Sequence, residues 1–321
     1  GSVAVSRKAL AGGAAAAILV TIDPILLRQS TLLMTETMAA AIVAFVIWWW
    51  SRSVAPRANL GSGAILGVLL AAAFLCRPTF LVWAAFLVIG LGGSGFFVRK
   101  PRNWRRLIQA ITAAAVILMV VGGWMTRNAR VIGHPVWATT HGGYTLLLAN
   151  NPSFYDYLRS GESGKTWQAE PFLIAYSHRY DGDPRTAEFW QREWPGMRLV
   201  QSDQVRREAT EHSDDQLAYE SAKSVIQRDP KMFLYSCFVR AYRLWKPFPY
   251  PIEGRSRVSL IAIGVYYICL YAAVLVGVWK LRSGLLRLRW WPVLGLLVTL
   301  TCVHAVYWSN IRMRAPAIPA I

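Results

Sequence analysis

Long apolar runs constrain this chain more than any other feature, because each has the length of a helix that crosses a membrane. Seven such runs occur: Ala9–Leu27, Leu32–Trp50, Leu60–Cys76, Phe80–Val98, Leu107–Met125, Val258–Trp279 and Trp290–Trp308. Crossing roughly 30 Å of hydrocarbon takes about 17 to 25 helical residues, and lipid offers no hydrogen-bond partner to an irregular backbone. The sequence therefore predicts an all-α polytopic membrane protein.

Basic residues predict how these spans are oriented. Segments that contain arginine or lysine and no acid occur at every second gap between the runs, at Arg7–Lys8, Arg52–Arg57, Arg99–Arg106 and Lys280–Arg289. Because the cytoplasmic ends of spans carry such an excess, we expect these gaps inside and the long polar segment outside. Residues 127–257 contain 18 basic and 15 acidic residues, so +15 of the net charge of +18 belongs to span ends beside anionic lipid. The lipid bilayer is therefore an expected partner and nucleic acid is not.

Three regions follow from this topology. Residues 1–126 are expected to form a transmembrane bundle of five spans, and residues 258–321 two further spans plus the start of a truncated one. Residues 127–257 are too many for a plain loop and are expected to form an inserted, mostly helical extracytoplasmic domain. In the first region, Gly63 and Gly67 lie one helical turn apart, which favours close helix packing.

Two helices are expected in the extracytoplasmic domain. The polar stretch Asp203–Asp229 lacks glycine and proline and predicts a helix on a wet surface. Pro230 predicts the start of a second helix, Lys231–Trp245, that mixes apolar residues with Arg240 and Arg243. This composition suits the membrane interface, with the apolar face toward lipid and the cations toward water.

Asp23 and Glu36 are the only acidic residues outside the extracytoplasmic segment. Both fall at the predicted outer ends of adjacent spans, where an acid is expected to pair or to serve a purpose. One interpretation makes them candidate catalytic residues of an outward-facing site. The alternative is structural: Asp23 caps or breaks a helix before Pro24, and Glu36 pairs with Arg28.

Five arginines depart from the charge pattern, because they fall at outer span ends: Arg28, Arg77, Arg127, Arg312 and Arg314. A guanidinium binds phosphate through a planar fork and stays charged when partly buried. These residues are therefore candidate ligands of a lipid phosphate. The alternative is five separate side chains that each reach to the interface.

Polar and aromatic residues after the fifth run are candidates for sugar or acceptor binding: Asn128, His141, Tyr144, Asn150 and Asn151. Amides and hydroxyls suit sugar hydroxyls, and a ring suits the apolar face of a sugar. A structured turn explains the Gly-Gly and Asn-Pro pairs in this stretch equally well. The five histidines show no metal-ligand spacing, so neither a metal nor a cofactor is expected.

Four stretches resemble the integral-membrane GT-C glycosyltransferases of the dolichyl-phosphate-mannose protein mannosyltransferase type, glycosyltransferase family 39. Its bacterial relatives include the aminoarabinose lipid A transferase and the Rgt-type sugar transferases. The stretches are Pro24–Ser30 through Thr35-Glu36, Arg77-Pro78, Trp124–Asn128 through Gly133 with Gly142–Pro152, and Arg312–Pro316. The resemblance implies a GT-C-like helical bundle in the bacterial inner membrane.

The resemblance also implies a reaction. A polyprenyl-phosphate sugar would be the donor and co-substrate, and the sugar would pass to a hydroxyl of a glycan, lipid or protein acceptor on the outer face. The family's catalytic aspartate lies in the first outer loop, which implies a base upstream of Gly1. Two alternatives remain open: a carrier or lipid flippase, which should show broken helices or acids at mid-membrane, and a non-catalytic subunit of glycan assembly.

Overall fold

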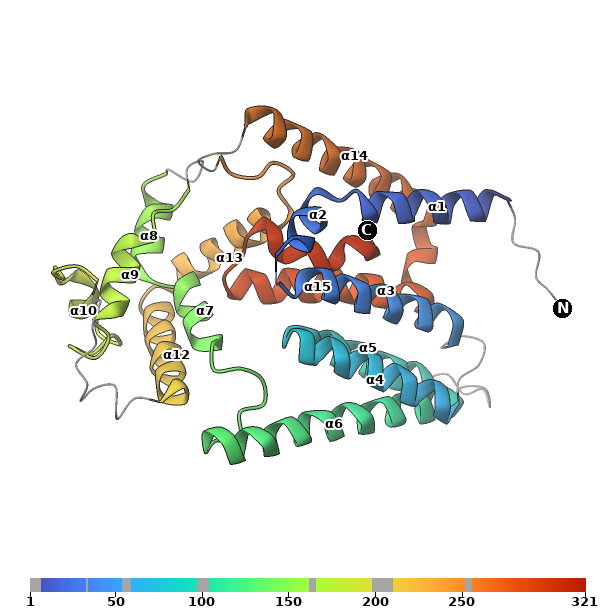
Figure 1. The fold of residues 1–321 in the computed structure, drawn as a ribbon, viewed down its shortest axis with the longest axis horizontal. Helices are drawn as coiled ribbons and strands as arrows, with labels where there is room; N and C mark the ends of the chain where they lie inside the picture. Colours follow the sequence, from blue (N-terminus) through green and yellow to red (C-terminus); the bar gives the residue numbers. More distant parts are fainter. Residues whose placement is uncertain are drawn as a thin grey trace. The chain divides into compact units, whose positions relative to one another are not determined.

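Every regular element in the described part of the chain is a helix (Figure 1). The computed structural model describes residues 7–32, 34–53, 59–96, 104–161, 166–197, 210–251 and 256–321. The helices are α1 (Arg7–Thr21), α2 (Pro24–Ser30), α3 (Glu36–Ser53), α4 (Leu60–Cys76), α5 (Phe80–Phe96), α6 (Trp104–Ile132), α7 (Gly142–Ala149), α8 (Pro152–Arg159), α9 (Glu170–Ser177), α10 (Ala187–Gln191), α12 (Glu211–Arg228), α13 (Pro230–Trp245), α14 (Arg257–Leu281) and α15 (Trp291–Val306), with 3₁₀ helices η2 (Arg282–Leu286), η3 (Leu288–Trp290) and η4 (Ile311–Ala320). The expected all-α class is confirmed.

The chain divides into two compact units. The first comprises Gly1–Gly122, Val265–Leu300 and Ile311–Ile321, and the second comprises Gly123–Gly264 and Thr301–Asn310. Helices α6, α14 and α15 each contribute residues to both units. The segment 127–257, expected as a separate domain, falls in the second unit.

Three described helices are long and apolar enough to cross a membrane: Trp104–Ile132, Arg257–Leu281 and Leu288–Val306. The pair α1 and α2 makes a fourth if it is counted as one broken span. Helices α4 and α5 have 17 residues each, at the lower limit of the length required. Fewer helices thus meet the length and composition for a span than the seven apolar runs predicted.

The first expected span, Ala9–Leu27, is not a straight helix. It breaks after Thr21, and α1 and α2 meet at 55°. At the break, Asp23 accepts hydrogen bonds from the amides of Ile25 and Leu26, both at 2.9 Å, and Pro24 opens α2. An aspartate cap followed by proline is a strong signal for a new helix. The structural interpretation of Asp23 is therefore correct, and residues 28–30, which lie between the first two apolar runs, form the end of α2.

Helices α4 and α6 pack closely in the first unit, as the glycine spacing predicted. A Cβ on Gly63 would lie 2.7 Å from the carbonyl oxygen of Gln109, and one on Gly67 would lie 2.7 Å from the Cβ of Val116. Next to them, the buried Gln109 amide donates to the Ser62 hydroxyl at 3.0 Å. Close approach and one buried polar contact are what hold helices together in an apolar surrounding.

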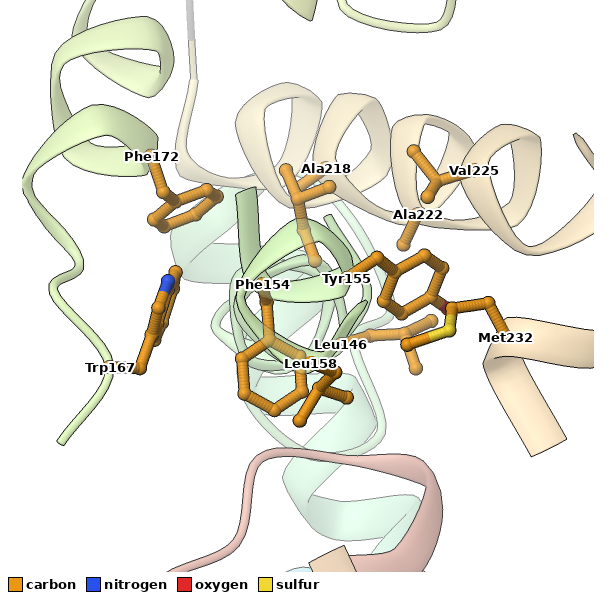
Figure 2. Close-up of a cluster of buried hydrophobic side chains, with 11 residues drawn as sticks. Leu146, Phe154, Tyr155, Leu158, Trp167, Phe172, Ala218, Ala222, Val225 and Met232 are labelled. Carbon is orange, nitrogen blue, oxygen red and sulfur yellow. The ribbon is translucent and has the colours of Figure 1, made fainter. Parts of the chain in front are cut away.

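The second unit has its own aromatic core (Figure 2). Asn151 caps α8 by accepting from the amide of Phe154 at 2.9 Å. The core then gathers side chains of α7, α8, α9, α12 and α13 and of the loop before α9: Leu146, Leu147, Phe154, Tyr155, Leu158, Trp167, Phe172, Ala218, Ala222, Val225 and Met232. A core of this kind can hold a domain together on its own.

The two predicted helices of this unit are present with altered details. Helix α12 begins at Glu211, capped by Thr210, and residues 203–209 of the predicted helix lie outside the described residues. Helix α13 begins at Pro230, as predicted, with Asp229 as its cap. The expected orientation of its cations is wrong: Arg240 and Arg243 are buried, whereas Leu234 and Phe238 are exposed. Both arginines point inward and donate hydrogen bonds there, Arg240 to backbone carbonyls and Arg243 to the Tyr157 hydroxyl.

Candidate functional site

Glu36 gathers two of the predicted arginines in the first unit. One carboxylate oxygen, Oε1, lies 2.8 Å from Arg77 Nη2 and 3.2 Å from Arg312 Nε. Glu36 is the first residue of α3, where the helix dipole favours a negative charge. Arg77 ends α4 in an extended conformation, as expected for a residue before proline, and its Nε donates to the Thr35 hydroxyl at 3.0 Å.

Asp23 forms a second buried group with α14 and η4. Besides capping α2, its carboxylate accepts from the Tyr267 hydroxyl at 2.8 Å. The guanidinium carbon of Arg314 lies 3.8 Å from the centre of the Tyr267 ring. Asp23, Tyr267 and Arg314 are each 0% exposed. Such a stack is a strong cation–π contact because little water competes for the cation.

The short helix η4 links the two groups, since Arg312 and Arg314 are two residues apart on it. Three arginines thus face two carboxylates, which leaves an excess of one positive charge. Arg77 and Arg312 keep 15% and 36% of their side-chain surfaces exposed. They can therefore meet an anion from outside, whereas the fully buried Arg314 holds η4 in place.

Two buried acceptors in the first unit lack hydrogen bonds within the described residues. They are Oε2 of Glu36 and Oε1 of Gln29, on residues that are 1% and 5% exposed. Buried polar atoms are nearly always paired, so each exception calls for an explanation. A ligand hydroxyl is a group that could satisfy them.

An apolar groove of about 290 Å³ borders the same segments. Its walls come from α1, α2, α3 and the end of η4, with Val20, Leu26, Leu27, Ala40, Ala44 and Pro319 among the lining residues. Thr37, which follows Glu36, also lines it. The charged cluster and the apolar groove thus share helix α3. This arrangement suits an amphiphile with an anionic head.

The other two predicted arginines are Arg28 and Arg127. Arg28 lies on the exposed face of α2, so the expected alternative pairing of Glu36 with Arg28 is wrong. Arg127 belongs to the second unit. Its guanidinium stacks on Trp124 with 5.0 Å between the guanidinium carbon and the ring centre, and it donates to Asn128 Oδ1 at 2.9 Å.

The asparagines predicted to bind sugar have structural roles. The Asn128 amide donates to the carbonyl of Val136 at 2.7 Å, and the Asn150 amide donates to the carbonyls of Leu146 and Val306. Asn150 and Asn151 are 0% exposed, and Asn151 caps α8. The side chains of these three asparagines are buried and bonded within the protein, so they are not accessible to a sugar.

His141 and Tyr144 remain available among the predicted sugar-binding residues. His141 is exposed and Tyr144 is half-buried, and their ring centres are 5.0 Å apart. Tyr144 also meets Tyr176 edge-on, with 5.1 Å between ring centres. Burial raises the pKa of Tyr144, so its hydroxyl stays protonated at neutral pH.

Two buried residues with several partners could not be recognised from the sequence. Tyr267 lies in an apolar span, and no local signal distinguishes it from a lipid-facing tyrosine. Arg240 was assigned to water, yet it is 0% exposed and donates to the carbonyls of Ala149 at 2.5 Å and Ala305 at 2.6 Å. Burial lowers its pKa. The burial of a cation on an amphipathic helix cannot be predicted from the sequence of that helix, because its partners lie elsewhere in the chain.

No group of three or more potential metal ligands occurs among the described residues. Comparison with known proteins adds no relative: no family model, curated protein or solved structure matches this chain. The geometry of the acid–arginine cluster and the motif resemblance are thus the grounds for assigning a function.

Proposed function

We propose that this protein is a membrane glycosyltransferase that moves a sugar from a polyprenyl-phosphate donor to an acceptor hydroxyl on the outer face of the membrane. The observation that carries the proposal is the buried acid–arginine cluster beside an apolar groove. The excess positive charge suits the donor phosphate, and the groove suits the first isoprene units. The motifs that resemble family 39 include Glu36, Arg77, Arg312 and Arg314, four members of this cluster.

The residues take distinct roles in this reaction. The acceptor oxygen bonds to the sugar's anomeric carbon, the bond from that carbon to the phosphate oxygen breaks, and the polyprenyl phosphate leaves with the electron pair. Arg77 and Arg312 stabilise the charge that develops on the departing phosphate. Glu36 holds both guanidiniums and offers Oε2 to a sugar or acceptor hydroxyl. A general base takes the acceptor proton.

A donor-turnover assay tests this proposal. The protein, in liposomes, is given radiolabelled polyprenyl-phosphate sugars, and free polyprenyl phosphate and glycosylated acceptor are measured. We expect Arg77→Gln and Arg312→Gln each to lower turnover by roughly 100-fold, the effect of removing one such charge-stabilising donor. Arg52→Gln is the matched control, because Arg52 is exposed at the opposite end of α3. Equal turnover in all four proteins would refute the assignment.

One observation favours a second candidate, a flippase for lipid-linked sugars. The break between α1 and α2 places Asp23 at an interrupted span, which is a feature of carriers. The same carboxylate is engaged by two amides and a tyrosine hydroxyl, which gives the break a structural cause. Movement of labelled donor between leaflets without any glycosylated product would favour the flippase. If the donor does not move and no product forms, the result would favour the non-catalytic assembly subunit.

A further inference from the structure

We propose that helix α13 lies flat at the membrane surface, with the face that carries Leu234 and Phe238 embedded in the headgroup and upper acyl region of the bilayer. This anchor is independent of the proposed sugar transfer. It assigns a lipid-contacting surface to a helix that is itself too polar to span.

The first support is where α13 is fastened. Its buried face bonds to the last turns of α15 at two points: Arg240 Nε donates to the Ala305 carbonyl at 2.6 Å, and Trp245 Nε1 donates to the Thr301 hydroxyl at 2.9 Å. The span that contains α15 ends at Val306. At about 1.5 Å per residue, Thr301 and Ala305 lie within roughly 8 Å of that end. Helix α13 is therefore held at the level where a span leaves the hydrocarbon.

The second support is its link to another span. Phe248, three residues after α13, packs directly on Gly264 of α14, where a Cβ would come within 2.1 Å of the ring. Only a glycine allows this contact. Gly264 lies near the start of the span Arg257–Leu281. Two membrane-spanning helices thus fix the C-terminal half of α13 near a membrane boundary.

The third support is the opposite face of α13. Leu234, Tyr235, Phe238 and Tyr242 are 58%, 49%, 75% and 66% exposed. Their spacing of three to four residues places them on one side of the helix. Leucine and phenylalanine flanked by tyrosines match the headgroup boundary, where an aromatic ring can be buried while its hydroxyl stays hydrated. The face therefore fits the membrane surface.

Spin-label accessibility tests this proposal in the full chain. The four free cysteines, Cys76, Cys237, Cys269 and Cys302, are replaced first, with Cys237→Ser because the Cys237 sulfur accepts from Arg240 and a hydroxyl can do the same. Single cysteines are then introduced by Leu234→Cys and Phe238→Cys, with Tyr242→Cys as a repeat one turn further on. The labelled proteins are placed in nanodiscs of phosphatidylcholine and phosphatidylglycerol.

Oxygen concentrates in the acyl region and a nickel chelate in water, so their relative effects on the label report its surroundings. We expect labels at the three sites to be accessible to oxygen and shielded from the chelate. Lys223→Cys, exposed on the polar helix α12, should show the reverse. Chelate accessibility at Phe238 equal to that at Lys223 would overturn the proposal. Shielding from both reagents would also overturn it, because it would indicate a protein partner or a second copy. None of these outcomes depends on sugar transfer.

Discussion

Arg77 and Arg312 meet at the same oxygen of Glu36, at 2.8 and 3.2 Å, although they lie more than two hundred residues apart in the sequence. Two like charges at one site repel each other, and a carboxylate between them offsets this repulsion. The buried Glu36 therefore sets the separation of two guanidiniums that remain partly exposed. Its substitution should affect both stability and anion binding.

The first prediction concerns the charge of Glu36. Glu36→Gln keeps the shape of the side chain and removes the shared negative charge. We expect the free energy of unfolding to fall by about 1–3 kcal/mol, because two cations lose their common partner. Thermal unfolding in detergent measures it, with Glu188→Gln on the exposed face of α10 as the control. An unchanged melting temperature would show that the arginines do not depend on Glu36.

The second prediction separates the two contacts of Tyr267. Tyr267→Phe removes the hydroxyl that donates to Asp23 and keeps the ring beneath Arg314. We expect a loss of about 1–3 kcal/mol. Tyr267→Leu should lose roughly 0.5–2 kcal/mol more, because the cation–π contact also disappears. Equal melting temperatures for the two variants would contradict a stabilising role for the ring.

The third prediction tests the close packing of α4 on α6. Gly67→Ala places a methyl group 2.7 Å from the Cβ of Val116, so the helices must move apart. We expect the variant to lose about 1–3 kcal/mol of stability, the usual effect of overpacking. Gly93→Ala is the matched control, because nothing lies within 4 Å of a Cβ there. A destabilised control and an intact Gly67 variant would be the opposite of the expected result.

Local signals in the sequence predicted several elements of both units. Helix α4 has the predicted bounds, because Asn59 caps its start and Arg77-Pro78 ends it. The glycine spacing in α4 and the start of α13 at Pro230 were also predictable from neighbouring residues. In each case the physical cause lies within a few positions of the element that it shapes.

The missed features depend on residues distant in the sequence. The hydroxyl of Tyr267 donates to Asp23, which is 244 positions away in the sequence. The residues next to Tyr267 give no indication of that partner. Arg240 turns inward, where it donates to carbonyl oxygens at the ends of α7 and α15. The amphipathic pattern of a single helix predicts that such a cation is exposed to water, because the pattern contains no information on neighbouring helices. The expected pairing of Arg28 with Glu36 is wrong for the same reason, because the exposure of Arg28 depends on the direction of α2 after the break.

The fourth prediction addresses Arg240. Arg240→Met keeps much of the side-chain volume and removes every hydrogen bond to Ala149, Asn150 and Ala305. Buried acceptors left without a donor should cost about 1–3 kcal/mol or more. The melting temperature should fall clearly, whereas Arg192→Met, at an exposed arginine of the same unit, should leave it unchanged. Equal melting temperatures for Arg240→Met and the original protein would show that Arg240 is not needed to join α13 to α15.

The fifth prediction is a pH dependence at Asp215 of α12. Burial raises the pKa of this carboxyl, while the Gly143 amide, which donates to it at 2.6 Å, and the charges of His141 and His212 oppose the shift. The folded protein then binds the proton more tightly than the unfolded chain, whose aspartate pKa is about 3.9. Stability from this group is therefore greatest below that value and falls as the pH rises through the folded pKa. Asp215→Asn keeps an oxygen for the Gly143 amide and removes the titration. We expect the melting temperature of the variant, relative to the original protein, to increase from pH 4 to pH 6. A constant difference across this range would show that Asp215 carries no raised pKa.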